Sequence, residues 1–268
     1  MNLVLFTSTY PFDGGAEQTF LDPELTHLCR EFDHIVLVPK KVVGKCLPLP
    51  QEVVVDEKYA VQLENANVFS LAGKLLGEKL LYRELASRPS LLLHPSALLR
   101  MARFLSVAKL TFDWAMNWLG QDKSGSRTVF YTYWFDSSSL GLALAKERYP
   151  HQVRLVSRVH GYDLYEEYYY KPPYWPFRHA VLKLVDALFP DSDAGLRYLN
   201  EKYPEYSRLY ETGLLGVTNP GFRTVPSNDG VFRIVSCSML VPVKRVPLLM
   251  DGIRCAAQMR PGQRFEWT

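Results

Sequence analysis

Short apolar segments that alternate with helical patterns constrain the fold of this chain more than any other feature. The predicted strands are 3–7, 35–38, 127–133, 153–159 and 187–189, with 52–55 as a further candidate. Helix start signals stand between them. Residues 22–24 supply an N-cap, a first-position proline and an acid, and residues 136–138 supply another N-cap. This alternation predicts an α/β fold with a parallel sheet covered by helices on both faces.

Composition narrows the class of protein. The chain is 47% hydrophobic and 22% charged, which is ordinary for a globular protein with a sizeable core. A net charge of +3 is too small to indicate nucleic acid as a partner. The four scattered cysteines favour reduced thiols in a cytoplasmic protein over disulfides or a zinc site. Neither a signal-peptide pattern nor a membrane-length apolar run is present, so we expect neither secretion nor a membrane span.

A second α/β domain begins near the end of the chain. Residues 231–236 have the pattern of a buried strand, and residues 247–257 that of a helix with one apolar face. Lys244 and Arg245 lie just before this helix, where cations and a helix N-terminus together favour a phosphate. Solvated surface charge is the ordinary alternative for such a pair.

Domain boundaries follow from the same patterns. Residues 219–230 are rich in Pro, Gly, Ser and Asn and predict a linker. We therefore predict a Rossmann-like domain over 1–218 and the truncated start of a second one over 231–268. Inside the first, residues 65–119 interrupt the alternation with leucine-rich, mostly basic helices. Such an insertion suits an anionic membrane surface, or equally a helix packed on the domain with a solvated basic face.

Two short motifs follow predicted strands. Gly14 and Gly15 precede the first helix and allow the backbone to approach an anion, although a plain turn has the same composition. His160 directly follows the strand 153–159, at the edge of a parallel sheet where ligands bind. Its imidazole can hydrogen-bond a sugar hydroxyl, or can be satisfied inside a buried turn. No dinucleotide fingerprint, P-loop, metal-ligand cluster or Ser-His-Asp arrangement is present.

Residues 162–175 contain seven aromatic side chains. Aromatic faces suit sugar rings or lipid head groups. For most of these residues we favour the simpler interpretation of a loop that packs on itself.

The order of these motifs resembles the family 4 glycosyltransferases of the GT-B fold, most closely the bacterial branch that builds colanic-acid and capsular polysaccharides. The resemblance covers most of the chain and is least specific over 65–119. The motifs that carry it are the glycine pair 14–15, HGYD at 160–163, FPDS at 189–192, LGVTNPG at 215–221 and IVSCSMLVPVKRV at 234–246.

This resemblance implies two Rossmann-like lobes with the active site between them. The N-terminal lobe would bind the acceptor and the C-terminal lobe a nucleotide-diphosphate sugar. Transfer would retain the anomeric configuration and use no cofactor or essential metal. The residues carried over are His160 as the catalytic contact with the donor sugar, Gly14, Gly15, Lys244 and Arg245 for the donor phosphates, and Glu17 and Asp163 as acceptor-side or supporting residues.

Two departures from the family pattern matter. Met239 stands where the family commonly carries an arginine, so one diphosphate cation is missing unless Arg245 replaces it. The family's Glu-x7-Glu segment would lie beyond Thr268. We therefore expect this chain to be a fragment that transfers no sugar alone.

The leading hypothesis is a retaining, hexosyltransferase-type glycosyltransferase that extends a lipid-linked surface polysaccharide at the cytoplasmic face of the membrane. The alternative is a non-catalytic lobe that binds glycan or pairs with a separate donor lobe. A sugar-nucleotide epimerase shares the two-lobed plan, but the segments 160–163 and 241–246 disfavour it.

Overall fold

The structure is a computed structural model in which the chain forms two compact units, Met1–Thr218 and Asn219–Thr268. Gly14 and Met239 lie outside the residues that it describes. The described residues are 1–13, 15, 17–66, 77–121, 125–219, 221, 223–238 and 240–268.

The first unit is built on a six-stranded sheet in which every pairing is parallel. The strand order is β3-β2-β1-β4-β5-β6, so the winding direction reverses between β1 and β4. Leu3 of β1 lies opposite Ile35 on one side and Val129 on the other. The strands are β1 (Asn2–Thr7), β2 (His34–Pro39), β3 (Val53–Val55), β4 (Thr128–Thr132), β5 (Val153–Val159) and β6 (Ala187–Pro190).

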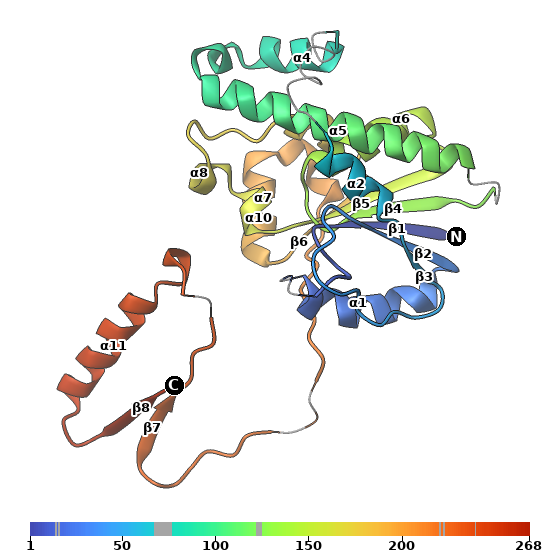
Figure 1. Ribbon diagram of the computed structural model, residues 1–268. Coiled ribbons are helices and arrows are strands. Elements are labelled where there is room, and N and C mark those ends of the chain that lie inside the picture. Colours follow the sequence, from blue (N-terminus) through green and yellow to red (C-terminus); the bar gives the residue numbers. More distant parts are fainter. Residues whose placement is uncertain are drawn as a thin grey trace. The chain divides into compact units, whose positions relative to one another are not determined.

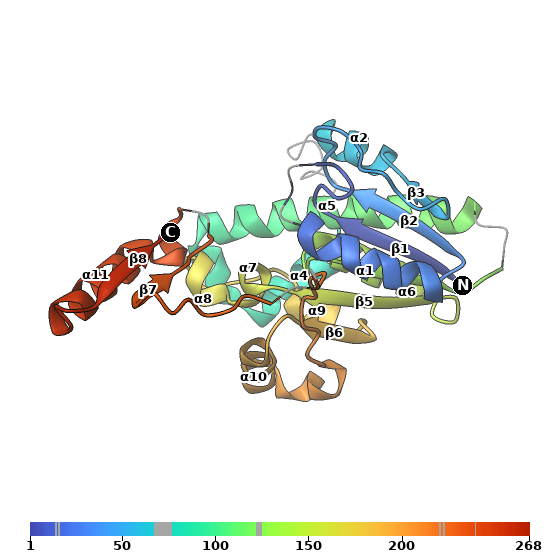
Figure 2. The same ribbon diagram turned by 90° about the horizontal axis from the view of Figure 1, so that it is seen from below.

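Helices cover both faces of this sheet, which confirms the predicted fold class. Figures 1 and 2 show α5 and α6 on one face and α1 on the other. The helices are α1 (Gln18–Glu31), α2 (Lys58–Glu64), α4 (Lys79–Ser87), η1 (Pro89–Leu93), α5 (Pro95–Gln121), α6 (Ser137–Arg148), α7 (Gly161–Leu164), α8 (Glu166–Tyr169), α9 (Arg178–Leu182), α10 (Asp193–Lys202) and η2 (Pro204–Leu209).

The two-residue period of β1 divides the core into two layers. Leu3 and Leu5 point to one face and pack in a cluster with Leu21 of α1. Val4 and Phe6 point to the other face and join the cluster formed by α5 and α6. All six residues of β1 are buried, as the continuous apolar run predicts for a central parallel strand.

The helix α1 begins earlier than the sequence indicates. Asp22 and Pro23 predict a start at that point, but the helix already begins at Gln18, with Pro23 inside it. The carbonyl of Glu17 accepts the N–H of Leu21 at 2.9 Å and thereby closes the first turn. Because Glu17 is itself anchored by its side chain, its position fixes the helix start and overrides the local start signal.

The predicted insertion 65–119 contains α4, η1 and the 27-residue helix α5. Its segment 67–76 lies outside the described residues. The helix α5 packs closely on α6, because a Cβ added at Gly141 would lie only 2.4 Å from the carbonyl oxygen of Ala108. Along the described parts of the chain, no helix is both long and apolar enough to cross a bilayer.

The second unit contains one strand–helix–strand repeat. Its elements are β7 (Val231–Ile234), η3 (Pro242–Lys244), α11 (Val246–Met259) and β8 (Arg264–Trp267), and the two strands pair in parallel. None of the residues 246–259 is buried within the unit, although α11 is amphipathic.

Candidate functional site

A cavity of about 260 Å³ opens at the carboxyl edge of the sheet. It lies at the end of β1 and β4, where the strand order reverses, and this is the place where open α/β sheets bind ligands. Its walls come from the loops after β1 and β4, from α7 after β5, and from the segment before α9. The lining residues are Ser8, Trp134, Asp136, Tyr162, Asp163 and Trp175.

Glu17 holds the first wall of the cavity together. Its buried carboxylate accepts the backbone N–H groups of Ser8, Thr9 and Tyr10 at distances from 2.8 to 3.1 Å. It also accepts the indole N–H of Trp134 at 2.5 Å, which links the β1 loop to the β4 loop. Glu17 is therefore a positioning residue, since its oxygens already serve these protein donors.

Gly15 allows the same loop to close on itself. A Cβ at this position would lie 2.1 Å from the hydroxyl oxygen of Thr9. A side chain at this position would therefore require the Thr9 hydroxyl to move. The predicted approach of Gly15 to a donor phosphate stays a prediction, and Gly14 lies outside the described residues.

His160 ends β5 and precedes α7, as the sequence predicts. Its Nε2 lies 3.0 Å from the carbonyl oxygen of Tyr133, which can only accept, so Nε2 carries a proton in this contact. Its Nδ1 lies 3.4 Å from a carboxylate oxygen of Asp191. The ring also packs against Trp134, with centroids 4.6 Å apart. His160 is thus a buried, fixed side chain behind a wall of the cavity.

The acidic partner of His160 lies at the end of β6. The hydrogen bond with His160 lowers the pKa of Asp191, although partial burial acts in the opposite direction. The carboxylate therefore remains ionised at the sheet edge and fixes the orientation of the imidazole ring.

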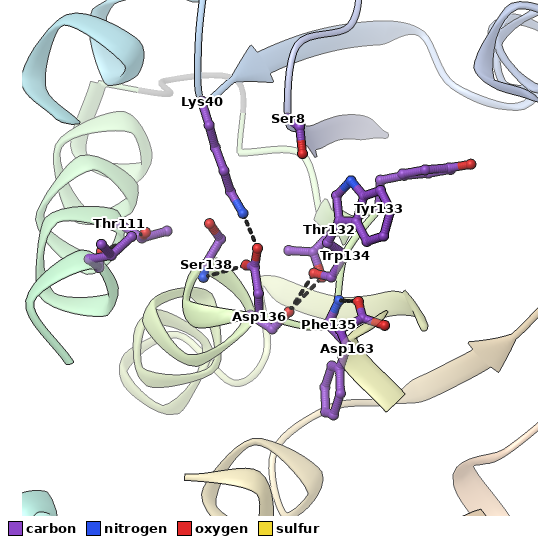
Figure 3. Close-up of polar contacts among 12 residues, drawn as sticks. Ser8, Lys40, Thr111, Thr132, Tyr133, Trp134, Phe135, Asp136, Ser138 and Asp163 are labelled. Atoms are coloured by element: carbon purple, nitrogen blue, oxygen red, sulfur yellow. Dashed lines mark hydrogen bonds and ion pairs between the residues drawn. The ribbon is translucent and has the colours of Figure 1, made fainter. Parts of the chain in front are cut away.

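Asp163 joins the loops after β4 and β5. One carboxylate oxygen accepts the N–H of His160 and the other that of Phe135, each at 2.6 Å. Arg178 donates to the Asp163 carbonyl oxygen at 2.5 Å. Burial raises the pKa of the Asp163 carboxyl to about 6, against the opposing effect of His160, the two N–H donors and Arg178. Figure 3 shows the bond between Asp163 and Phe135.

An ion pair that the sequence did not reveal lies at the same edge. Lys40 follows β2 directly and pairs with Asp136, which caps the N-terminus of α6 by accepting the N–H of Ser138 at 2.9 Å (Figure 3). Burial would lower the pKa of Lys40, but the nearby Asp136 carboxylate outweighs it and the pKa is raised. Lys40 therefore stays charged and neutralises Asp136.

The predicted cationic phosphate ligands, Lys244 and Arg245, belong to the second unit. Lys244 ends η3, and Arg245 follows in a left-handed conformation, with φ of 51°, as the residue before α11. Both side chains are exposed. The predicted arrangement of two cations beside a helix N-terminus is therefore present in the second unit. The other predicted site residues, Glu17, His160 and Asp163, lie together in the first unit. Within the described residues, no three His, Cys, Asp or Glu side chains are placed to hold a metal ion.

A scan against protein-family models finds no match for the chain, and a search of curated proteins also finds none. Among solved structures, the chain is similar to one of trehalose-6-phosphate synthase, which was studied with bisubstrate glycomimetics for glycosyl transfer with retention. The TM-score is 0.50 over 99% of this chain, and 12% of the aligned residues are identical. The chain spans 62% of the length of that structure. At this identity the likeness shows the fold alone, which is that of a Rossmann-like domain of the GT-B type.

Proposed function

We propose that this chain is part of a retaining, hexosyltransferase-type glycosyltransferase of family 4. The donor would be a nucleotide-diphosphate sugar, and the acceptor a growing, lipid-linked surface polysaccharide of the capsular or colanic-acid type. The observation that carries the proposal is the cavity lined by carboxylates and aromatic rings at the switch point of a GT-B-type sheet. The motif order over 160–163 and 234–246 supports the same class.

Each unit has its own task in this proposal. The first unit binds the acceptor in the cavity, and His160, which lies behind Trp134 and outside the lining, helps to orient the donor sugar by holding Trp134 in place. A ring that Tyr133 and Asp191 hold in place suits that role, because fixed groups position a reactant without further loss of entropy. The second unit binds the donor diphosphate through Lys244 and Arg245, whose charges stabilise the leaving group as negative charge develops.

We further propose that the protein works at the inner face of the cell membrane. Leu92 and Leu93 of η1 are exposed, the latter by 79%, and exposed Arg83 and Arg103 lie on the neighbouring helices. Apolar and basic side chains together suit an anionic lipid surface. Replacing Leu92 and Leu93 by serine should release the protein from anionic vesicles, and added salt should weaken binding of the native chain. Equal recovery on neutral and anionic vesicles would contradict the membrane role.

A transfer assay tests the main proposal. The intact protein, expressed from its own gene, is given labelled nucleotide-diphosphate sugars and lipid-linked glycans, alongside the 268-residue chain. We expect the intact protein to form a product with retained anomeric configuration, and the 268-residue chain to form none. Lys244→Ala should abolish most transfer, whereas Arg254→Ala on the exposed side of α11 should not. Absence of product from the intact protein, or an unaffected Lys244→Ala variant, would reject the proposal.

A non-catalytic binding role is the second candidate. The observation that favours it is the apolar surface of α11, where Leu248, Met250 and Met259 are each more than half exposed. Such a surface suits a separately supplied donor lobe. Glycan binding without transfer by the intact protein, and transfer only after a second chain is added, would support this candidate over the first.

A further inference from the structure

We propose that the cavity at the sheet edge binds an uncharged pyranose ring of the acceptor, stacked on Tyr162 and hydrogen-bonded through its hydroxyls to Asp136 and Ser8. This inference rests on the proposed glycosyltransferase function and specifies the substrate class of the same site.

Tyr162 is an exposed ring held in one position. It is 54% exposed, yet it contacts Tyr169 and Trp175 edge-on, with centroid distances of 5.1 and 6.3 Å. Its hydroxyl oxygen also accepts a hydrogen bond from Tyr170 at 3.3 Å. Because neighbours already fix the ring, binding a ligand on its open side costs little conformational entropy. A rigid aromatic ring that is more than half exposed suits the apolar C–H face of a sugar.

The side chain of Trp175, which packs against Tyr162, is itself held in place by its neighbours. Trp175 is buried, and the centroid of its ring lies 4.9 Å from the guanidinium carbon of Arg178. Phe135 contacts the same guanidinium at 5.0 Å. Arg178 is therefore enclosed between two rings, and Trp175 forms a fixed wall of the cavity beside Tyr162.

The same cavity also offers hydrogen bonds for hydroxyl groups. The carboxylate of Asp136 lines the cavity and already accepts from Lys40 and Ser138. A carboxylate has about four acceptor sites, so further sites are available to sugar hydroxyls. Ser8 also lines the cavity, and its hydroxyl can both donate and accept. Together these groups and Tyr162 provide the combination that sugars require, which is hydrogen-bonding groups and an aromatic ring in one cavity.

Charge limits the kind of sugar. Of the described residues that line the cavity, none is positively charged, whereas Asp136 and Asp163 carry carboxylates. The charge of Lys40 is already balanced by Asp136. Because the pair of Lys40 and Asp136 carries no net charge, a phosphate or carboxylate on the bound ring would meet the Asp163 carboxylate without an unpaired cation to compensate.

The volume of the cavity further limits the kind of sugar that can bind. Sites for drug-sized ligands measure about 300–1,000 Å³. A cavity of about 260 Å³ is smaller than these and suits a single ring. We therefore infer that the cavity holds one terminal sugar of the acceptor, with the rest of the glycan outside it.

Titration with simple sugars tests the inference. Trp134 and Trp175 line the cavity, so their fluorescence reports binding. The probes are the methyl glycosides of glucose, mannose and galactose, with glucose 6-phosphate as the charged comparison. We expect at least one methyl glycoside to bind and glucose 6-phosphate to bind more weakly. Tyr162→Ala should weaken binding roughly tenfold. Tyr162→Phe keeps the ring and should bind like the native chain.

Tyr168→Ala is the matched control, because Tyr168 is 78% exposed on the neighbouring helix α8 and does not line the cavity. Circular dichroism of each variant establishes that it is folded. Failure of all three methyl glycosides to bind, or equal binding by native protein and Tyr162→Ala, would overturn the inference. Tighter binding of glucose 6-phosphate would overturn the requirement for an uncharged ring.

The two proposals can fail separately. Sugar transfer by the intact protein, with no role for Tyr162 in binding methyl glycosides, would remove the inference and leave the glycosyltransferase function. Glycoside binding that depends on Tyr162, without transfer by the intact protein, would keep the sugar site and remove that function.

Discussion

The carboxylate of Asp163 accepts the backbone N–H of Phe135 at 2.6 Å, although 28 residues separate the two positions in the chain. Phe135 follows β4 and Asp163 lies in α7 after β5, so this bond fixes two neighbouring strand ends against each other. The second oxygen of Asp163 secures His160 in the same way. One buried carboxylate thus sets the relative position of two walls of the cavity.

Replacing this carboxylate should destabilise the first unit. In Asp163→Asn, an amide NH2 replaces one acceptor oxygen and faces a backbone N–H, so one donor loses its partner. We expect the free energy of unfolding to fall by about 1–3 kcal/mol. Urea denaturation measures this loss. Asp113→Asn is the control, since Asp113 is exposed and only pairs with Lys109 one helical turn away, and it should change stability by less than about 0.5 kcal/mol. Equal effects of the two substitutions would show that the Asp163 bonds contribute little.

The raised pKa of Asp163 predicts a pH dependence of stability. Burial raises this pKa from 3.8 to about 6, so between these pH values the folded state holds the proton more tightly than the unfolded state. The contribution of Asp163 to the free energy of unfolding therefore decreases as the pH rises through this window, and becomes constant above it. Urea denaturation across this range, compared between the native chain and Asp163→Asn, isolates the effect. A stability difference that does not vary between pH 3.8 and 6 would contradict it.

The sheet was predictable because its strands are buried on both faces and therefore read as continuous apolar runs. The segments predicted at 3–7, 35–38 and 153–159 coincide closely with β1, β2 and β5. Residues 22–24 predicted the wrong helix start. The side chain of Glu17, which accepts the N–H of Ser8 in the preceding loop, anchors the start of α1 instead. Local signals of that kind cannot compete with a buried carboxylate that serves several backbone donors.

The cavity could be predicted only in part. The position of His160 and Asp163 at the sheet edge was predictable because both follow soon after a recognisable strand. The pairing of Lys40 with Asp136 was not found, because 96 residues separate them and only the strand order places β2 and β4 on either side of β1. The sequence offered one signal for a shared location of Lys40 and Asp136, which is that each residue follows a predicted strand. The sequence likewise could not decide whether His160 contacts a ligand or is buried, since its partners Tyr133 and Asp191 come from other strands.

The contact between α5 and α6 should tolerate no side chain at Gly141. A Cβ there would lie 2.4 Å from the Ala108 carbonyl oxygen, and backbone cannot move aside as a flexible side chain can. We expect Gly141→Ala to lower the free energy of unfolding by about 1–3 kcal/mol. Gly120→Ala is the matched control in α5, because no described atom lies within 4 Å of its added Cβ. That variant should be neutral or gain up to about 1 kcal/mol. Urea denaturation of both variants measures the difference, and equal stabilities would contradict the close packing.

The pair of Lys40 and Asp136 should show strong energetic coupling. The two side chains are only 16% and 24% exposed, so water screens their attraction poorly. In a double-mutant cycle with Lys40→Met and Asp136→Asn, we expect a coupling energy of about 1–3 kcal/mol. Each single variant leaves one partly buried polar partner without its ion pair, and the double variant removes both charges. The pair Lys109 and Asp113 provides the matched control, because it is exposed and should couple by less than about 1 kcal/mol.

Urea denaturation of the four proteins in each cycle gives both coupling energies. Raising the salt concentration should weaken the Lys109 pair more than the Lys40 pair, since screening acts chiefly on exposed charges. Similar coupling in the two cycles would mean that the Lys40 pair is solvated. In that case there would be no support for the premise that Lys40 cannot compensate the charge of a bound sugar. The cycle therefore tests the electrostatic premise for an uncharged acceptor ring independently of any sugar titration.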